Sequence, residues 1–216
     1  MSQAFSRTSV LVIKLCLIGA VVLAVVATFL IRWRMAPERV AFAPVEQPIP
    51  FSHKHHVGDD GIDCRYCHTS VEKSSFAGLP STQICLTCHS QLFRDAPMLA
   101  PLHASALRNE PIHWNRVYDL PDFVYFDHSI HVNKGVACIE CHGRVDQMPV
   151  IWRVASLDMQ WCLGCHRNTG QHIRPLSEVF SMTSRAPLSS QDVEQLQRIY
   201  RLQDRRRLTD CSTCHR

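Results

Sequence analysis

The sequence has few glycine and aromatic residues, and it lacks the alternation of strands and helices that marks a βαβ unit. Only 8 of its 216 residues are glycine and 8% are aromatic, whereas 12 prolines are scattered along the chain. This composition predicts short helices and extended loops with little or no sheet. The missing βαβ pattern excludes a thioredoxin-like domain, in which a single Cys-x-x-Cys pair precedes a helix.

Cysteine and histidine, by contrast, are plentiful and stand together. The chain has 11 cysteines, and ten of them form five copies of Cys-x-x-Cys-His. This is the attachment signature of c-type haem, in which two thiols add across the vinyl groups and the histidine binds the iron from the proximal side. The sequence therefore predicts five covalently bound haem c groups. Their cysteines are Cys64, Cys67, Cys85, Cys88, Cys138, Cys141, Cys162, Cys165, Cys211 and Cys214, and their proximal ligands are His68, His89, His142, His166 and His215.

Two other interpretations of paired cysteines fit less well. Structural zinc sites use pairs of pairs, so five pairs leave one over. Ten cysteines could form five disulfides, but a disulfide framework needs no histidine after each pair.

Bound haem would also change the net charge of the protein. The formal net charge of +4 becomes about −6 when five haems add ten propionates. We therefore interpret the arginines first as propionate partners. The basic run at 201–208 is then a solvated helix face or a subunit contact, and we expect no nucleic-acid partner.

The N-terminus has the pattern of a membrane anchor. Residues 15–31 carry no charged side chain, and extension back to residue 10 adds only Lys14. A membrane-spanning helix needs about 20 apolar residues, whereas the apolar part of a cleaved signal peptide has about 7–15. We predict an uncleaved anchor at 1–35, with its transmembrane segment at about 10–31. Because haem c is attached outside the cytoplasm, we expect a single-pass protein of the bacterial inner membrane with its haem domain on the periplasmic side.

A proline-rich linker at 36–50 is followed by an internal repeat. The text "FSHKHHVGDDGIDCRYCH" (51–68) matches "FDHSIHVNKGVACIECH" (126–142), and each copy precedes a second haem motif. We predict two dihaem modules, at 51–120 and 121–188, and a C-terminal part at 189–216 that holds the fifth haem. In that part an amphipathic helix over 189–203 is expected to pack on the fifth haem, whereas the proline-containing region 98–121 is expected to be a loop.

The repeated Phe-x-His-x-x-His motif places two imidazoles on neighbouring faces of one helical turn. It resembles the motif of the multihaem class III and cytochrome c7-like families, where it precedes Cys-x-x-Cys-His. The resemblance implies that His53 and His128 are distal ligands of the first and third haems, which gives low-spin iron. It also implies that His56 and His131 serve other haems, within or across the repeat. The alternative is that these histidines bond propionates or backbone, and His55, outside the pattern, is expected at the surface.

Four distal histidines leave one haem without a partner. A methionine ligand would raise the potential of that haem, although core packing is the alternative role of each methionine. The candidates are His103, His113, His172, Met148, Met159 and Met182.

Nearly the whole chain resembles the pentahaem cytochrome c subunit of alternative complex III, a bacterial quinol oxidoreductase. The matching text is the anchor, the two repeats, "LPDFVYFDHSIHV" (120–132), "DMQWCLGCHRN" (158–168) and "LTDCSTCHR" (208–216). The resemblance implies a mainly α protein with extensive coil, a multihaem cytochrome c fold organised around five haems, and one N-terminal transmembrane helix. It also implies a subunit of an integral membrane complex, without substrate chemistry of its own. Such a subunit relays electrons from quinol, through an iron–sulfur subunit, to a monohaem cytochrome subunit or a terminal oxidase.

Two alternatives remain open. One is a membrane-anchored multihaem quinol dehydrogenase, although Cys64 lies 33 residues beyond Ile31 (64 − 31), farther from the anchor than that family implies. The other is a multihaem reductase with one open haem, for which the unassigned fifth distal ligand is the only opening.

Overall fold

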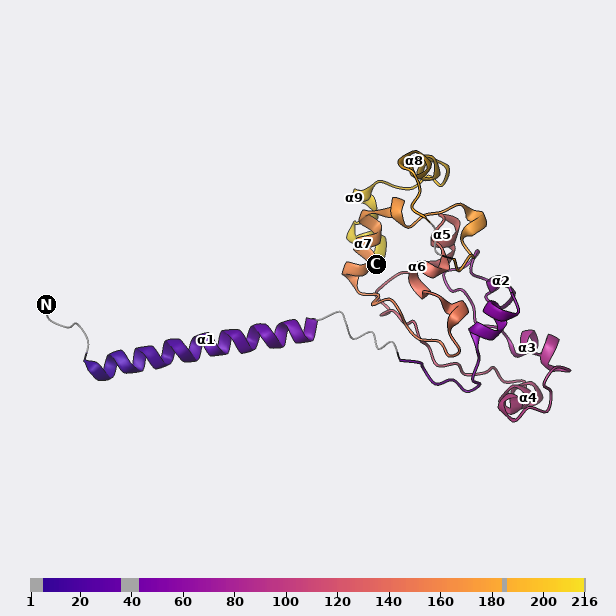
Figure 1. Ribbon diagram of the computed structural model, residues 1–216, viewed down its shortest axis with the longest axis horizontal. Coiled ribbons are helices and arrows are strands. Elements are labelled where there is room, and N and C mark those ends of the chain that lie inside the picture. Colours follow the sequence, from indigo (N-terminus) through magenta and orange to yellow (C-terminus); the bar gives the residue numbers. More distant parts are fainter. Residues whose placement is uncertain (1–5, 36–42, 184–185, 216) are drawn as a thin grey trace. The chain divides into compact units, whose positions relative to one another are not determined.

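The computed structural model of the chain describes residues 6–35, 43–183 and 186–215. It divides into two compact units, Met1–Arg39 and Val40–Arg216 (Figure 1). Within the described ranges the chain is helical and contains no strand, and two isolated β-bridges join Val124 to His215 and Val136 to Ile173. The prediction of a mainly α chain with extensive coil is therefore confirmed. Residues 36–42 of the predicted linker lie outside the described residues.

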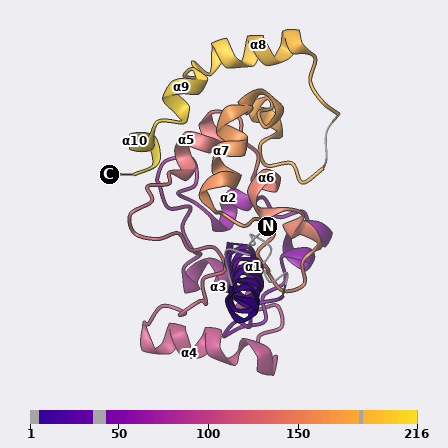
Figure 2. The same ribbon diagram turned by 90° about the vertical axis from the view of Figure 1, so that its left-hand side faces the viewer.

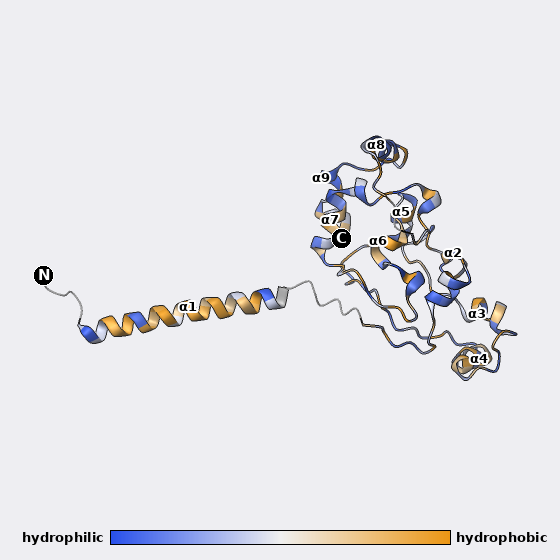
Figure 3. Cartoon of the chain, viewed as in Figure 1, coloured by the Kyte–Doolittle hydropathy of each residue, from blue (hydrophilic) through white to orange (hydrophobic). Residues whose placement is uncertain are grey.

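The first unit contains one long helix, α1 (Arg7–Met35). Its part Arg7–Trp33 has a mean hydropathy of 2.9 and is long and apolar enough to cross a membrane. Figure 3 shows apolar residues along almost all of its length. The hydroxyl of Thr28 donates to the carbonyl of Ala24 at 2.7 Å, so this polar group is satisfied within the helix, as an apolar surrounding requires.

The second unit contains short helices joined by extended segments. Figures 1 and 2 both place α3 and α4 at one end of this unit and α8 and α9 at the opposite end. The helices are η1 (Lys54–Asp59), α2 (Cys64–Cys67), α3 (Thr82–His89), η2 (Pro97–Leu99), α4 (Ala100–Arg108), α5 (His128–Asn133), α6 (Cys138–His142), η3 (Val145–Gln147), α7 (Met159–Arg167), η4 (Thr169–Gln171), η5 (Leu176–Glu178), α8 (Ser190–Ile199), α9 (Arg205–Leu208) and α10 (Cys211–Cys214).

The apolar core of this unit is divided into small clusters. Among the described residues three clusters stand apart, each built on three buried side chains. They are Ile49, Leu99 and Leu102, then Val71, Val132 and Val179, and finally Val145, Met148 and Met182. Such small clusters do not fill a domain of this size by themselves, so the arrangement fits a fold in which haem macrocycles supply the rest of the core.

One sequence expectation needs correction. The region 98–121 was expected to be a loop, but it contains α4, because Pro101 stands in the first turn of that helix, where a missing N–H is tolerated.

The C-terminal helix is present as α8, with Ser189 as its N-cap. It contacts η4, which follows the fourth haem motif. Gly170 allows this contact, because a Cβ there would come within 2.5 Å of Val193 Cγ1.

Candidate haem sites

Each Cys-x-x-Cys-His motif lies on or directly after a short helix. Residues three apart on one helical turn lie on the same face, so the two thiols of each pair can reach one edge of a porphyrin. An aspartate caps three of these helices, and its carboxylate accepts a backbone N–H in the first turn, as Asp63 does in α2, Asp158 in α7 and Asp210 in α10. All eleven cysteines are unbridged, and no three His, Cys, Asp or Glu side chains in the described ranges cluster to hold a bare metal ion. The thiols are thus free for attachment to haem.

The two Phe-x-His-x-x-His copies have the same geometry. The Phe51 ring meets His53 edge-on at 4.9 Å and stacks on His56 at 4.5 Å. In the second copy the corresponding distances from Phe126 are 4.8 Å to His128 and 4.6 Å to His131. The match holds although the first copy begins a π-helix and the second begins an α-helix. Each phenylalanine therefore orients both imidazoles of its motif, a role that the sequence comparison of the repeats did not reveal.

The histidines of these motifs lie opposite histidines of the haem motifs. His128 faces His142, with ring centroids 6.4 Å apart and planes only 13° from parallel. The corresponding separation is 6.1 Å both for His56 with His89 and for His131 with His166. Two imidazoles that bind one ion from opposite sides through bonds of about 2 Å have centroids about 6 Å apart. These three pairs therefore have the spacing of bis-histidine iron, and His56 and His131 each face the second haem motif of their own module.

His53 lies beside His68, the histidine of the first haem motif. Burial, and next the nearby His68 and His56, lower the pKa of His53 to about 4. Burial also lowers the pKa of His142 to about 4, followed in effect by His128, His68 and His53. Both imidazoles are therefore neutral at physiological pH, the state in which histidine binds a metal.

The protonated ring nitrogen is set by the backbone in seven of these histidines. A carbonyl can only accept, so each Nδ1 that contacts a carbonyl must carry the proton, and Nε2 is left free for iron. The Nδ1···O distances lie between 2.7 and 3.1 Å. The partners are His56 with Ser52, His68 with Gly78, His89 with Leu92, His128 with Ser75, His131 with Asp127, His166 with Leu208 and His215 with Phe123.

Two further residues support these sites without any signal in the sequence. The Tyr118 ring lies 4.4 Å from that of His142, and its hydroxyl donates to the Cys141 carbonyl at 3.2 Å and accepts from Val154 N–H at 3.0 Å. Gly78, whose carbonyl holds His68, has a φ of +86° and lies so close to Ser70 that a Cβ would come within 2.8 Å of its hydroxyl. Glycine is therefore needed at this position.

The candidates for the fifth distal ligand have different surroundings. His113 is exposed, and Met148 and Met182 are buried in an apolar cluster. His172 Nδ1 lies 3.1 Å from a Glu140 carboxylate oxygen that belongs to the third haem motif. The Nε2 of His103 is buried and has no hydrogen-bond partner among the described residues. The Met159 side chain, at the start of α7, is 61% exposed.

The fifth haem motif lacks an imidazole pair in the described part of the chain. The ring beside His215 is that of Phe123, with centroids 5.9 Å apart. A phenyl ring cannot bind iron, so this motif differs from the three motifs with imidazole pairs.

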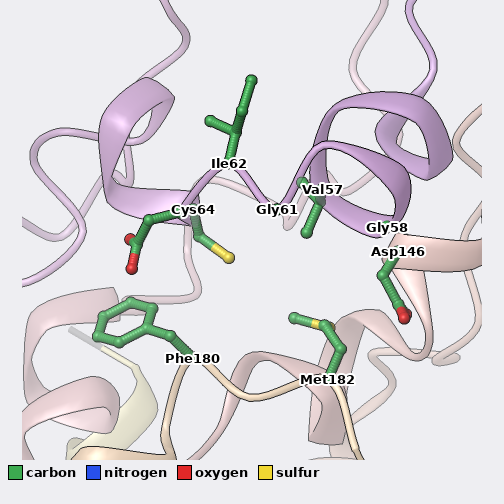
Figure 4. A pocket seen from close by; sticks show the side chains of 9 residues that line it. Val57, Gly58, Gly61, Ile62, Cys64, Asp146, Phe180 and Met182 are labelled. Carbon is green, nitrogen blue, oxygen red and sulfur yellow. The ribbon is translucent and has the colours of Figure 1, made fainter.

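The first haem motif borders a cavity of about 290 Å³. Figure 4 shows the side chains of Cys64 and Met182 pointing toward this space from two separate segments. The arginines near the motifs have protein partners: Arg65 pairs with Asp63 at 2.8 Å, and the buried Arg174 pairs with Glu140 at 3.0 Å.

No protein-family profile matches the chain. It is 40% identical over 111 residues to the multihaem cytochrome c subunit of menaquinone reductase from Nitratidesulfovibrio vulgaris, a match that covers 51% of each protein. It is also 30% identical over 114 residues to the cytochrome subunit of acrylate reductase from Shewanella woodyi, and this match covers 68% of that subunit and 53% of the chain. This chain belongs to the multihaem cytochrome c family. The expectation of covalently bound haem c and of electron transport is therefore confirmed. The chain spans about half the length of the menaquinone reductase subunit that it matches.

Proposed function

We propose that this multihaem cytochrome carries five haem c groups and transfers electrons within a membrane-bound, quinone-linked respiratory complex. The three imidazole pairs at 6.1–6.4 Å carry the proposal, because bis-histidine iron has no open position for a substrate. Haem, when bound, supplies one-electron redox chemistry at its iron. The likeness to a subunit of menaquinone reductase supports the link to quinone.

The chain's own residues bind and orient the haems in this proposal. The ten motif cysteines hold the macrocycles, and His68, His89, His142, His166 and His215 are the proximal ligands. The three imidazole pairs support three distal ligands: His56 for the haem at Cys85/Cys88, His128 for Cys138/Cys141, and His131 for Cys162/Cys165. His53, which lies beside His68, is the proposed distal ligand for the haem at Cys64/Cys67. Residues 51–120 and 121–188 are then two dihaem modules, and 189–216 holds the fifth haem.

The resemblance to the pentahaem subunit of alternative complex III favours one setting for this role. In it, α1 anchors the chain in the bacterial inner membrane and the haem unit faces the periplasm. An iron–sulfur subunit delivers electrons that come from quinol, and a monohaem cytochrome or a terminal oxidase receives them. Direct quinol oxidation by the chain itself is the competing role, and the menaquinone reductase relative is compatible with both.

A reductase with one open haem is the second candidate function. The observation that favours it is the phenyl ring of Phe123 beside His215, where three other motifs have an imidazole. Met159 or His172 would close this position if either binds the fifth iron.

One set of spectra on the purified, air-oxidised protein tests both candidates. The pyridine haemochrome assay should give five haems per chain, and electron paramagnetic resonance should show only low-spin iron. A near-infrared charge-transfer band would then identify a methionine ligand. A haem count other than five refutes the proposal, and a high-spin haem that responds to nitrite or cyanide favours the reductase.

A further inference from the structure

The haem motifs contact one another in an order that differs from their order in the chain. We number the haems 1 to 5 by the sequence order of their motifs, at Cys64/Cys67, Cys85/Cys88, Cys138/Cys141, Cys162/Cys165 and Cys211/Cys214. This reasoning rests on the proposed function, because it requires five bound haems.

Motif 2 is joined to motif 1. Tyr66 lies between the cysteines of motif 1 and Thr87 between those of motif 2, and their hydroxyls are 2.8 Å apart. Since each sulfur adds to a vinyl group at the porphyrin edge, contact between the residues that separate the cysteines of two motifs brings two haem edges together.

Motif 1 is joined to motif 3 rather than only to its own module. Cys64 of motif 1 and Cys138 of motif 3 pack against one apolar cluster, which contains Met148 and Met182. The Nδ1–H of His128, which faces His142 of motif 3, is held at 2.8 Å by the carbonyl of Ser75, seven residues after motif 1. The two dihaem modules therefore meet through their first haems.

Motif 3 is joined to motif 4. Glu140, between the cysteines of motif 3, binds His172 at 3.1 Å and Arg174 at 3.0 Å, and both residues follow motif 4. An isolated β-bridge also joins Val136, two residues before motif 3, to Ile173, seven residues after motif 4.

Motif 4 is joined to motif 5. His166 donates its Nδ1–H to the carbonyl of Leu208 at 2.8 Å, and Leu208 stands three residues before Cys211. In the described part of the chain no contact of this kind joins motif 2 to motif 4 or motif 5, and Figures 1 and 2 place α3 away from α7 and α9.

We propose that the five haems form one unbranched row in the order 2–1–3–4–5. Haems 2 and 5 are then the two ends, where electrons enter and leave. Every electron that crosses the protein must then pass from one module to the other between haem 1 and haem 3.

Nuclear magnetic resonance of the full chain in lipid nanodiscs tests this order directly. Haem methyl groups are labelled with ¹³C through δ-aminolevulinic acid, and the protein is fully reduced, so that low-spin iron is diamagnetic. Each haem is assigned by its nuclear Overhauser contacts with the histidine and cysteines of its own motif. We expect inter-haem contacts for the pairs 1–2, 1–3, 3–4 and 4–5. A contact that joins haem 2 to haem 3, 4 or 5, or haem 5 to haem 1 or 3, overturns the order.

Ligand variants supply a second readout. His56→Met changes the potential of haem 2 and His131→Met that of haem 4, because methionine raises the haem potential. When stepwise oxidation is followed by the methyl shifts, the first variant should perturb one neighbour, haem 1, and the second should perturb two, haems 3 and 5. The reverse counts contradict the order. The haem count and spin state of the same samples test the proposed function separately, so five low-spin haems with a different contact pattern would refute the order alone.

Discussion

Replacement of His56 by alanine should turn one haem in five from low-spin to high-spin. The His56 ring lies 6.1 Å from that of His89, and the Nδ1–H of His56 is held by the Ser52 carbonyl at 2.9 Å. Its Nε2 is therefore free on the side of the second haem. Alanine has no ligand atom, so this iron loses its sixth ligand while the other four keep theirs.

The fold should survive this change. His56→Ala removes the ring stacked on Phe51 at 4.5 Å, an interaction worth about 0.5–1.5 kcal/mol. A domain is typically stable by about 5–15 kcal/mol, so the loss alone does not unfold the chain. The haem content per chain should accordingly stay the same, which separates loss of a ligand from loss of a haem.

The assay is spin quantitation by electron paramagnetic resonance, with His55→Ala as the matched control. His55 is exposed, and its Nε2 lies 3.5 Å from Asp60, so its removal should leave all iron low-spin. Added imidazole should enter the space left in His56→Ala and restore the low-spin signal. Entirely low-spin iron in His56→Ala without imidazole, or a high-spin signal of equal size in His55→Ala, would refute the assigned ligand.

Three more predictions concern Tyr118, Asp146 and the N-terminal helix. Tyr118→Phe leaves the N–H of Val154 without its acceptor, so the free energy of unfolding should fall by about 1–3 kcal/mol in thermal unfolding. The resonances of haem 3 should shift as well, and unchanged stability would contradict this role of Tyr118. The pKa of Asp146 is lowered by its paired Arg144, so its stabilising effect is present above the unfolded pKa of about 4 and is lost as pH falls through the folded value. Acid unfolding of Asp146→Asn should therefore be less steep than that of the wild type, and identical profiles would rule this out. Deletion of residues 1–39 should move the haem unit from the membrane fraction to the soluble fraction. A haem unit that stays in the membrane fraction would contradict anchoring by α1.

The sequence predicted local features of the haem sites well. The spacing of Cys64, Cys67 and His68 is sufficient to indicate haem attachment, because all three groups act within one turn of helix. The repeat around Phe51 and Phe126 also indicated which histidines share a structural role. These inferences depend on residues that are close in sequence, where spacing and geometry are directly linked.

Contacts between distant segments could not be predicted in the same way. Cys64 and Cys138 are 74 residues apart (138 − 64), and no local pattern indicates that they pack against the same apolar cluster. The support of His142 by Tyr118 likewise depends on how two loops pack. The helix α4 was missed for a different reason: Pro101 was interpreted as a loop signal, although proline is favourable in the first turn of a helix.

The two modules share a motif but are not independent units. In the second copy, the Nδ1–H of His128 is bound by the carbonyl of Ser75, a residue of the first module, at 2.8 Å. In the first copy, the equivalent Nδ1 of His53 is buried without a hydrogen-bond partner. A hydrogen bond at Nδ1 raises the basicity of a ligating imidazole, so under the proposed ligation the same motif gives its two haems different ligand strengths. The first module thus orients a proposed ligand of the second, and Cys64 and Cys138 of the two modules pack against one apolar cluster. Separation of the modules would therefore remove both the orientation of His128 and the inter-module contact, which explains why a duplicated sequence forms one continuous haem unit.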